Sequence, residues 1–411
     1  MAKKTDKDRE KADRRRRRFW DFILPHVEGY VRKKFAFACD DFEPADIEGP
    51  VLLMINHTCA YDPLFAGAAF INKPLTFIAS EHLMRLKFAG AFLDRYTSII
   101  PHSKGSKASR TALVAIKRIR RGESIFLAPE GEQTWDGRPM PVMPFTAKLV
   151  KGSGATLVTY MIEGGYLSAP RWALYTRKGK VCGHPVNVYS PETLQGMTDE
   201  EVESAISRDL SFDTWEWQKT QPDGPVRFKC SKGGNADGLE RAVFTCPSCG
   251  RFGTLRSDGD FIGCRCGFRV RLEDTGFFEE GAPFETICEW EDLDRSAIGE
   301  RLKKLPAADA ESEIVFTDEG VTLIGIEAGH EEKELARGKL EMKLYAEGPV
   351  LETGGRAFPL RGVSSMTMVL AGRVVFSDES GYYELRSDKK GRTNLRKYVI
   401  AREVITEKVK E

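Results

Sequence analysis

Short apolar runs alternate with segments of helical periodicity between about residues 36 and 190. The runs are "PVLLMIN", "LTFIAS", "SIIP", "SIFLAPEG" and "TLVTYMI". Between two of them, "ASRTALVAIKRIRRG" places Leu113, Ile116 and Arg120 at helical spacing and ends at Gly122, a residue typical of helix C-caps. Parallel strands require crossover connections, which are usually helices. The alternation therefore predicts an α/β domain with a mostly parallel sheet.

A turn-rich break at residues 221–225, "QPDGP", ends this region, and a second break, "EEGAP", follows a segment rich in Gly and Cys. The last 120 or so residues then alternate short β-patterned runs with turns and finish in "RTNLRKYVIAREVITEKVKE". This pattern predicts a small antiparallel barrel or sandwich closed by a helix. Its outline resembles a pleckstrin-homology or GRAM-type module, and a generic β-barrel used for packing or dimerisation is the alternative.

The N-terminal segment concentrates positive charge. Over the whole chain Lys plus Arg (62) and Asp plus Glu (61) nearly cancel, which gives no argument for nucleic acid, but the first twenty residues hold ten basic and four acidic residues. Phe19, Trp20 and Phe22 follow beside this charge. The mixture suits an amphipathic helix lying on an anionic membrane. A solvated basic tail followed by a helix packed on its own domain is the alternative.

The stretch "NHTCAYD" follows the apolar run "VLLMI" and places His57 five positions before Asp62. An aspartate that accepts the Nδ1 proton of a histidine leaves Nε2 free to take a proton from a substrate hydroxyl. The structural alternative is that Asp62 caps a helix through "PLFAGAAF", since Pro63 suits a first helical turn. About seventy residues later "SIFLAPEG" ends a second apolar run in Glu130 and Gly131. Two strand ends with polar motifs at one sheet edge favour a ligand crevice there.

These motifs carry a family resemblance. "NHTCAYD", then "PEG", then "MPFTAKLVKGSGATLV" resemble the glycerolipid acyltransferases of the lysophosphatidic acid acyltransferase type over roughly residues 45–190. The resemblance implies transfer of an acyl group from acyl-CoA or acyl-carrier protein to the hydroxyl of a lysophospholipid acceptor such as 1-acyl-glycerol-3-phosphate, in phospholipid biosynthesis. It also implies that His57 is the general base, that Asp62 orients it, and that Glu130 and Gly131 hold the acceptor.

The sequence departs from the family pattern at three places, and two of them concern the acceptor. Gln133 stands where the family usually has a phosphate-binding arginine, and "SIIPHSKGSK" offers Lys104 and Lys107 where another arginine is usual. A proline usual in "TLVTYMIE" is also missing. Glutamine cannot supply the bidentate fork of arginine, so Lys104, Lys107 or Arg138 must hold any phosphate. A non-catalytic lipid-binding or scaffold protein that keeps the acyltransferase fold is the competing hypothesis.

The cysteines form a separate pattern. The chain has nine, and Cys246, Cys249, Cys264 and Cys266 lie in "CPSCGRFGTLRSDGDFIGCRCGF", where a hairpin with Asp258 and Gly259 at its turn joins two close pairs. The spacing resembles a zinc ribbon and predicts one structural Zn²⁺ on four thiolates. A redox pair or unrelated thiols are the alternative. The acidic hairpin tip argues against nucleic acid.

No apolar stretch is long enough to span a membrane, and the N-terminus has no signal-peptide pattern. We therefore expect a cytoplasmic protein that is peripheral on the membrane. The predicted parts are a basic amphipathic membrane-surface segment (1–35), an acyltransferase domain (36–225), a zinc ribbon (226–275) and a β-rich domain with a terminal helix (281–411).

Overall fold

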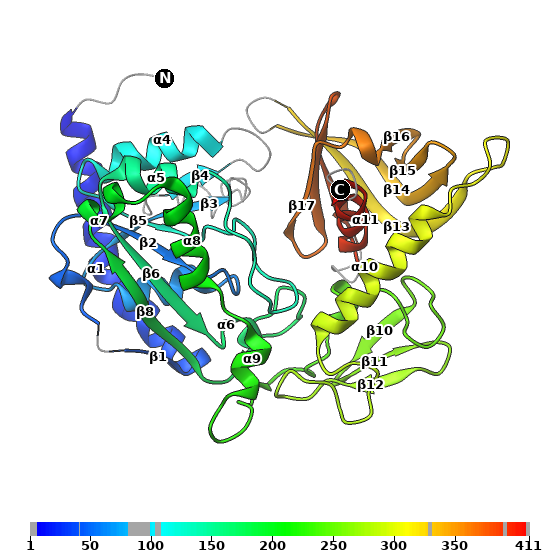
Figure 1. The fold of residues 1–411 in the computed structure, drawn as a ribbon, viewed down its shortest axis with the longest axis horizontal. Coiled ribbons are helices and arrows are strands. Elements are labelled where there is room, and N and C mark those ends of the chain that lie inside the picture. The colour runs from blue at the N-terminus through cyan, green and yellow to red at the C-terminus, as the bar shows by residue number, and fades with distance from the viewer. Residues whose placement is uncertain are drawn as a thin grey trace. The chain divides into compact units, whose positions relative to one another are not determined.

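The computed structural model describes residues 6–40, 42–80, 99–102, 108–327, 331–388 and 393–407 (Figure 1). The chain forms two compact units. The first comprises the residues up to Pro170 together with Thr176–Lys229, and the second comprises Arg171–Tyr175 and the chain from Cys230 onward.

The first unit is built on a sheet of seven strands, counted over the described residues, in the order β1-β8-β6-β2-β5-β3-β4. Five of them run parallel, as the alternating pattern predicted, whereas β8 is antiparallel to β6 and pairs in parallel with β1. Pro185 of β8 lies at a register shift opposite Tyr160, where a residue without a backbone N–H is tolerated. The strands are β1 (Phe37–Cys39), β2 (Val51–Ile55), β3 (Leu75–Ser80), β4 (Ile99–His102), β5 (Ser124–Leu127), β6 (Thr156–Glu163) and β8 (Val181–Tyr189).

Helices cover both faces of this sheet because its central strands are apolar on both sides. In β2, Leu53 contacts one core together with α1 and α2, while Leu52 and Met54 contact the other core together with α4, α5 and α8. A strand buried on both faces reads as a continuous apolar run, as "VLLMI" does. The helices are α1 (Asp6–Phe35), α2 (Asp62–Ala69), α4 (Ala108–Ile119), α5 (Thr146–Ser153) and α8 (Asp199–Leu210), with the shorter α6 (Gly165–Ser168), α7 (Pro191–Gly196) and α9 (Thr214–Lys219).

Strands β2 and β5 are neighbours at the centre of the sheet, and the helices that follow them lie on opposite faces. The chain leaves β2 through α2 on one side and leaves β5 through α5 on the other. This is a topological switch point, where loops diverge and leave a crevice beyond the carboxyl ends of the strands. The two polar motifs sit at this crevice.

Helix α1 packs on its own domain over its second half. Leu24, Val31 and Phe35 are buried, and the ring of Trp20 lies 5.7 Å from that of Phe77. Trp20 is therefore a packing residue in this fold, whereas Phe22 is exposed. This part of α1 is therefore packed on its own domain, as the alternative to a membrane-surface helix predicted.

The second unit is β-rich with a terminal helix, as predicted. A seven-stranded antiparallel sheet, again within the described residues, has the order β16-β15-β14-β13-β19-β18-β17, and α11 packs against its last strand. A three-stranded sheet β10-β11-β12 carries the cysteines. The elements are β10 (Leu255–Asp258), β11 (Phe261–Cys264), β12 (Arg269–Arg271), α10 (Ile287–Lys303), β13 (Glu313–Ile326), β14 (Glu332–Tyr345), β15 (Gly348–Thr353), β16 (Arg356–Pro359), β17 (Ser365–Leu370), β18 (Arg373–Asp378), β19 (Gly381–Ser387) and α11 (Arg396–Glu407).

Candidate active site and cysteine cluster

The end of β2 is fixed to the neighbouring strand by a buried amide. Asn56 donates from Nδ2 to the Ile162 carbonyl (2.9 Å) and accepts the Ile162 N–H (2.7 Å), so it continues the ladder after the strand has ended. Met54 pairs with Leu127 in the parallel register, and His57 and Glu130 each lie three residues further along the chain, at the same level. Sheet register thus places the two motifs side by side.

His57 and Asp62 form a hydrogen-bonded pair. Nδ1 of His57 lies 2.8 Å from Oδ2 of Asp62, whose side chain is fully buried, while the imidazole keeps 21% of its surface exposed. A carboxylate at Nδ1 selects the tautomer that carries its proton on Nδ1 and leaves Nε2 as the basic nitrogen. The imidazole is oriented from the buried side and reachable from the other.

Asp62 is held by its neighbours and does not cap the helix. Its carboxylate accepts the backbone N–H groups of Thr58 (2.8 Å) and Cys59 (2.9 Å) and the Thr58 hydroxyl (2.6 Å). The N-cap position of α2 is Tyr61, and Asp62 is the first residue of the helix. The capping alternative is therefore wrong, and the turn before α2 is folded around the carboxylate. Burial and the nearby Asp62 raise the pKa of Cys59 well above its usual value, which keeps that thiol protonated.

Glu130 lies against the same turn. Its Oε1 accepts the backbone N–H of His57 at 3.0 Å, whereas Oε2 is buried and, within the described residues, has no hydrogen-bond partner. Burial raises the pKa of this carboxyl to about 7, and the His57 imidazole offsets that effect only in part. Near neutral pH Glu130 is thus divided between a hydrogen-bond donor and a negatively charged acceptor.

A narrow pocket joins His57 and Glu130 to Arg138, which lies in a loop held by hydrogen bonds. Arg138 donates from Nε to Oδ2 of Asp136 (2.6 Å) and from its backbone N–H to Oδ1 (3.0 Å). The indole of Trp215 donates to the Asp136 carbonyl at 2.8 Å. The loop is close-packed at Gly137, where an added Cβ would lie 3.0 Å from the Tyr166 ring and the backbone φ is +90°. These contacts fix a guanidinium at the pocket.

The other predicted acceptor residues are placed differently. Gly131 has φ +70°, and a Cβ there would lie 2.6 Å from the Met143 sulfur, so this turn accepts only glycine. Gln133 does not line the pocket. Lys104 and Lys107 lie outside the described residues. Arg138, the candidate phosphate-binding cation that lies within the described residues, lines the same pocket as His57. The sequence signal for its loop is "TWDG", in which a short polar side chain before glycine predicts a tight turn.

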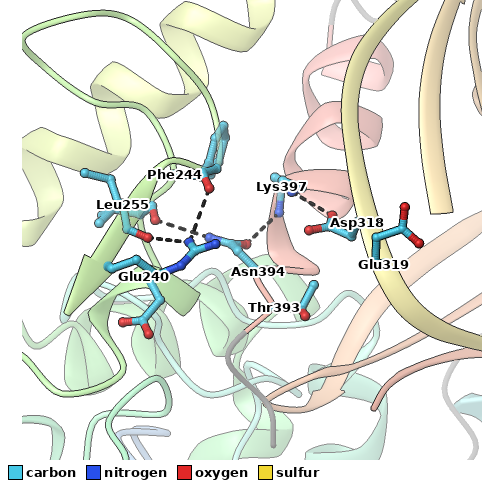
Figure 2. A pocket seen from close by; sticks show the side chains of 11 residues that line it. Glu240, Phe244, Leu255, Asp318, Glu319, Thr393, Asn394 and Lys397 are labelled. Atoms are coloured by element: carbon cyan, nitrogen blue, oxygen red, sulfur yellow. Dashed lines mark hydrogen bonds and ion pairs between the residues drawn. The ribbon is translucent and has the colours of Figure 1, made fainter. Parts of the chain in front are cut away.

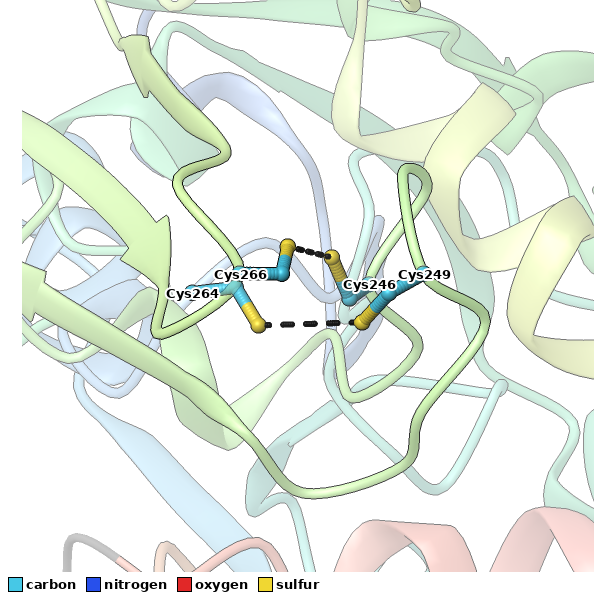
Figure 3. A group of neighbouring side chains, drawn as sticks. All are labelled: Cys246, Cys249, Cys264 and Cys266. Carbon is cyan, nitrogen blue, oxygen red and sulfur yellow. Dashed lines mark hydrogen bonds between the residues drawn. The ribbon is translucent and has the colours of Figure 1, made fainter.

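The four clustered cysteines converge in the second unit (Figure 3). Cys246 and Cys266 have their sulfurs 3.6 Å apart, those of Cys249 and Cys264 are 3.9 Å apart, and all four lie within 4.8 Å of one another. A tetrahedral ion with metal–sulfur bonds of about 2.3 Å requires sulfur separations of about 3.8 Å. The cluster is close enough to hold a metal ion, and an all-thiolate set suits zinc or iron.

A larger cavity of about 520 Å³ also lies in the second unit (Figure 2). Its buried Lys397 pairs with Asp318 at 2.7 Å, and Asn394 accepts the Lys397 backbone N–H at 3.0 Å. No imidazole or thiol is among the residues that line it. Its charged side chains pair mainly with other residues of the cavity wall, as Lys397 does with Asp318. The larger volume of this cavity alone is therefore no evidence that it is the reactive site.

A family model matches part of the first unit. Residues 29–163 match the family model described as Acyltransferase. This part, about a third of the chain, is similar to the acyltransferase family. The predicted resemblance is thereby confirmed, and the matched segment contains His57, Asp62 and Glu130. The α/β sheet of the first unit extends beyond the matched segment, since it includes β8.

Among solved structures, the chain is similar to the crystal structure of the 1-acyl-sn-glycerophosphate (LPA) acyltransferase PlsC from Thermotoga maritima. The sequence identity is 18%, the TM-score is 0.40, and the match covers 49% of this chain and 82% of that one. No curated protein matches the chain. Within the described residues no helix is both long and apolar enough to cross a membrane.

Proposed function

We propose that the protein is a glycerolipid O-acyltransferase that moves a fatty acyl group from an acyl thioester to the hydroxyl of a lysophospholipid, with His57 and Asp62 as the catalytic pair. The observation that carries the proposal is the 2.8 Å hydrogen bond from Nδ1 of His57 to Asp62. The Asp62 side chain is fully buried and accepts several further hydrogen bonds, and the pair lies at the switch point of the sheet. A scaffold protein would have no need to orient an imidazole in this way.

The proposed reaction uses the acceptor itself as the nucleophile. Nε2 of His57 takes the proton of the acceptor hydroxyl as its oxygen attacks the thioester carbonyl carbon, which forms a tetrahedral oxyanion. Collapse of this intermediate breaks the carbon–sulfur bond, and the departing thiolate receives the proton from the imidazolium. The products are an ester and a free thiol of coenzyme A or acyl-carrier protein. Asp62 stabilises the transient imidazolium and keeps its proton on Nδ1.

Arg138 supports a phosphate-bearing acceptor such as 1-acyl-glycerol-3-phosphate. Asp136 occupies the Nε side of the guanidinium, which fixes its plane while 38% of the side chain remains exposed. A pre-oriented arginine loses little entropy when it binds an anion. This residue supplies the charge that Gln133 lacks, and Glu130 lines the same pocket while its Oε1 accepts the His57 N–H.

We further propose that Cys246, Cys249, Cys264 and Cys266 hold one structural Zn²⁺. The sulfur separations of 3.6 and 3.9 Å fit a closed tetrahedral site. Four thiolates leave no open position for substrate, so the metal would stabilise the fold of its loops. The proposed location is the cytoplasmic surface of a membrane, because the lipid acceptor resides in a membrane. The exposed Phe22 beside the N-terminal arginines supports this location.

The test of catalysis is acyl transfer by the purified chain from labelled acyl-CoA or acyl-carrier protein to lysophosphatidate, lysophosphatidylcholine and monoacylglycerol. We expect His57→Ala to reduce turnover by at least about a thousandfold, because it removes the base. His184→Ala, at a half-buried histidine of the same domain, is the matched control. Lipid binding without turnover by the unaltered chain, or full turnover by His57→Ala, contradicts the proposal.

The role of Arg138 has a separate readout. Arg138→Gln should raise the KM for lysophosphatidate by roughly 10- to 100-fold, since a charge-assisted contact is worth about 1.5–3 kcal/mol. The KM for monoacylglycerol, which has no phosphate, should stay unchanged. Arg208→Gln, at an exposed arginine paired with Asp209, is the control. Equal effects on both acceptors would assign Arg138 to loop stability instead.

A further inference from the structure

An unusual residue lies at the start of α5. Phe145 has φ +71° and ψ +10°, the left-handed region that bulky side chains rarely adopt, and 64% of its surface is exposed. Glycine or asparagine would fit this backbone without strain. A strained backbone that holds an aromatic ring in water indicates a partner for the ring.

Helix α4, which packs on α5, also presents exposed apolar side chains. Leu113 is 58% exposed and Val114 is exposed as well, while Ala115 and Ile119 on the opposite side of α4 are buried. Because α4 and α5 follow parallel strands, both begin at the carboxyl edge of the sheet, which is the edge that carries His57. The helices pack side by side, as Arg120 donates to the Gly152 carbonyl at 3.0 Å (Figure 1).

The charged residues of α4 and α5 themselves are all basic, although Arg118 pairs with Glu123 and Lys151 with Asp199. Neither α4 nor α5 contains an acidic residue. Arg110, Lys117 and Lys148 are exposed, and over the described part of the chain no carboxylate pairs with them. The Lys148 ammonium lies 5.0 Å from the centre of the Phe145 ring. Exposed apolar side chains next to these basic residues are complementary to an anionic lipid bilayer, which has a negatively charged surface and an apolar interior.

We infer that the exposed Phe145, Leu113 and Val114, together with the cations of α4 and α5, form a docking surface for an anionic lipid bilayer. Lys117 and Lys148 attract the headgroups, and the Phe145 ring enters the interface. The exposed Met140 lines the pocket of His57 and precedes Phe145 by five residues, so the docked surface brings the pocket to the lipid layer. This surface lies on the opposite face of the sheet from α1, so it is a second contact independent of the N-terminal arginines.

Vesicle sedimentation of the full chain tests the inference without any acyl transfer. The probes are vesicles of phosphatidylcholine alone and of an equimolar mixture with phosphatidylglycerol. The Lys117→Gln, Lys148→Gln double variant should reduce partitioning to the mixed vesicles by roughly twentyfold, at about fivefold per charge. Phe145→Asn should reduce it by about tenfold while suiting the backbone better. Val188→Ser and Lys178→Gln alter an exposed apolar and an exposed basic residue elsewhere in the domain and serve as controls.

The outcomes separate this inference from the catalytic one. His57→Ala should bind vesicles as the unaltered chain does, whatever its turnover. Binding that is unchanged in the double variant and in Phe145→Asn overturns the docking surface, as does equal binding to neutral vesicles. A dimer of the unaltered chain that Phe145→Asn converts to a monomer in light scattering would also overturn it, because the surface would then be an interface between two copies.

Discussion

The buried carboxyl of Glu130 links the pocket to the pH dependence of folding. Its pKa rises from 4.5 to about 7 on folding, mainly because burial disfavours the charged form. Between these values the unfolded chain has already lost the proton that the folded chain keeps. The stability associated with this proton is therefore fully present at low pH and is lost as the pH rises through 7.

The size of the effect follows from the difference in pKa. A rise of about 2.5 corresponds to about 3 kcal/mol, and this is an upper value because the side chain is only half-buried while its Oε2 is buried. Glu130→Gln keeps an acceptor for the His57 N–H and removes the ionisable group. The free energy of unfolding of Glu130→Gln minus that of the unaltered chain should therefore be about 2–3 kcal/mol larger at about pH 8 than at about pH 5.

Urea unfolding followed by tryptophan fluorescence at the two pH values measures this difference. The second unit contributes equally to both chains and cancels in the comparison. Glu48→Gln, at an exposed glutamate before β2, is the matched control and should show no such gain. A Glu130→Gln effect that is the same at both pH values would refute the assignment of a desolvated carboxyl to this pocket.

Three further predictions concern the remaining sites. Asp62→Asn should lower kcat by roughly 10³- to 10⁴-fold with little change in KM, because the amide no longer fixes the imidazole tautomer, and steady-state kinetics checks this. Cys264→Ser should abolish stoichiometric zinc in elemental analysis and loosen the ribbon, whereas Cys230→Ser, outside the cluster, should keep the metal. Removing residues 1–18, which leaves the packed Trp20 in place, should weaken binding to anionic vesicles at low salt, and the difference from the intact chain should shrink as salt is added.

The sequence predicted the meeting of His57 and Glu130 because strand ends of a parallel sheet share one edge. It did not predict that β2 and β5 are direct neighbours. Their adjacency depends on the strand order of the sheet, which the crossover connections determine and local sequence patterns do not. It also left open whether Asp62 caps a helix or binds the imidazole, because both alternatives use the same residues. Only the folded turn, with two backbone N–H groups aimed at the carboxylate, decides between them.

The sequence named Arg138 as a candidate and "TWDG" marks its turn, but no local pattern places this loop beside His57. The loop is held by Trp215 and Tyr166, which lie far away in the chain and carry no motif. Helix α10, by contrast, was missed although it has a local signal. Thr286 accepts the N–H of Glu289 at the start of the helix, the Thr-x-x-Glu spacing that marks helix N-termini.

The pairing of β1 with β8 has a consequence for the nascent chain. Strand β1 joins the sheet only through β8, and β8 reaches β6 only after Val181–Tyr189 has been made. Tyr189 follows the end of β6 at Glu163 by 26 residues, which the ribosome adds in roughly one to five seconds. During this interval the edge of β6 can pair with another extended segment. A chaperone, or rapid pairing with β8, would protect the nascent chain from pairing with another chain at that edge.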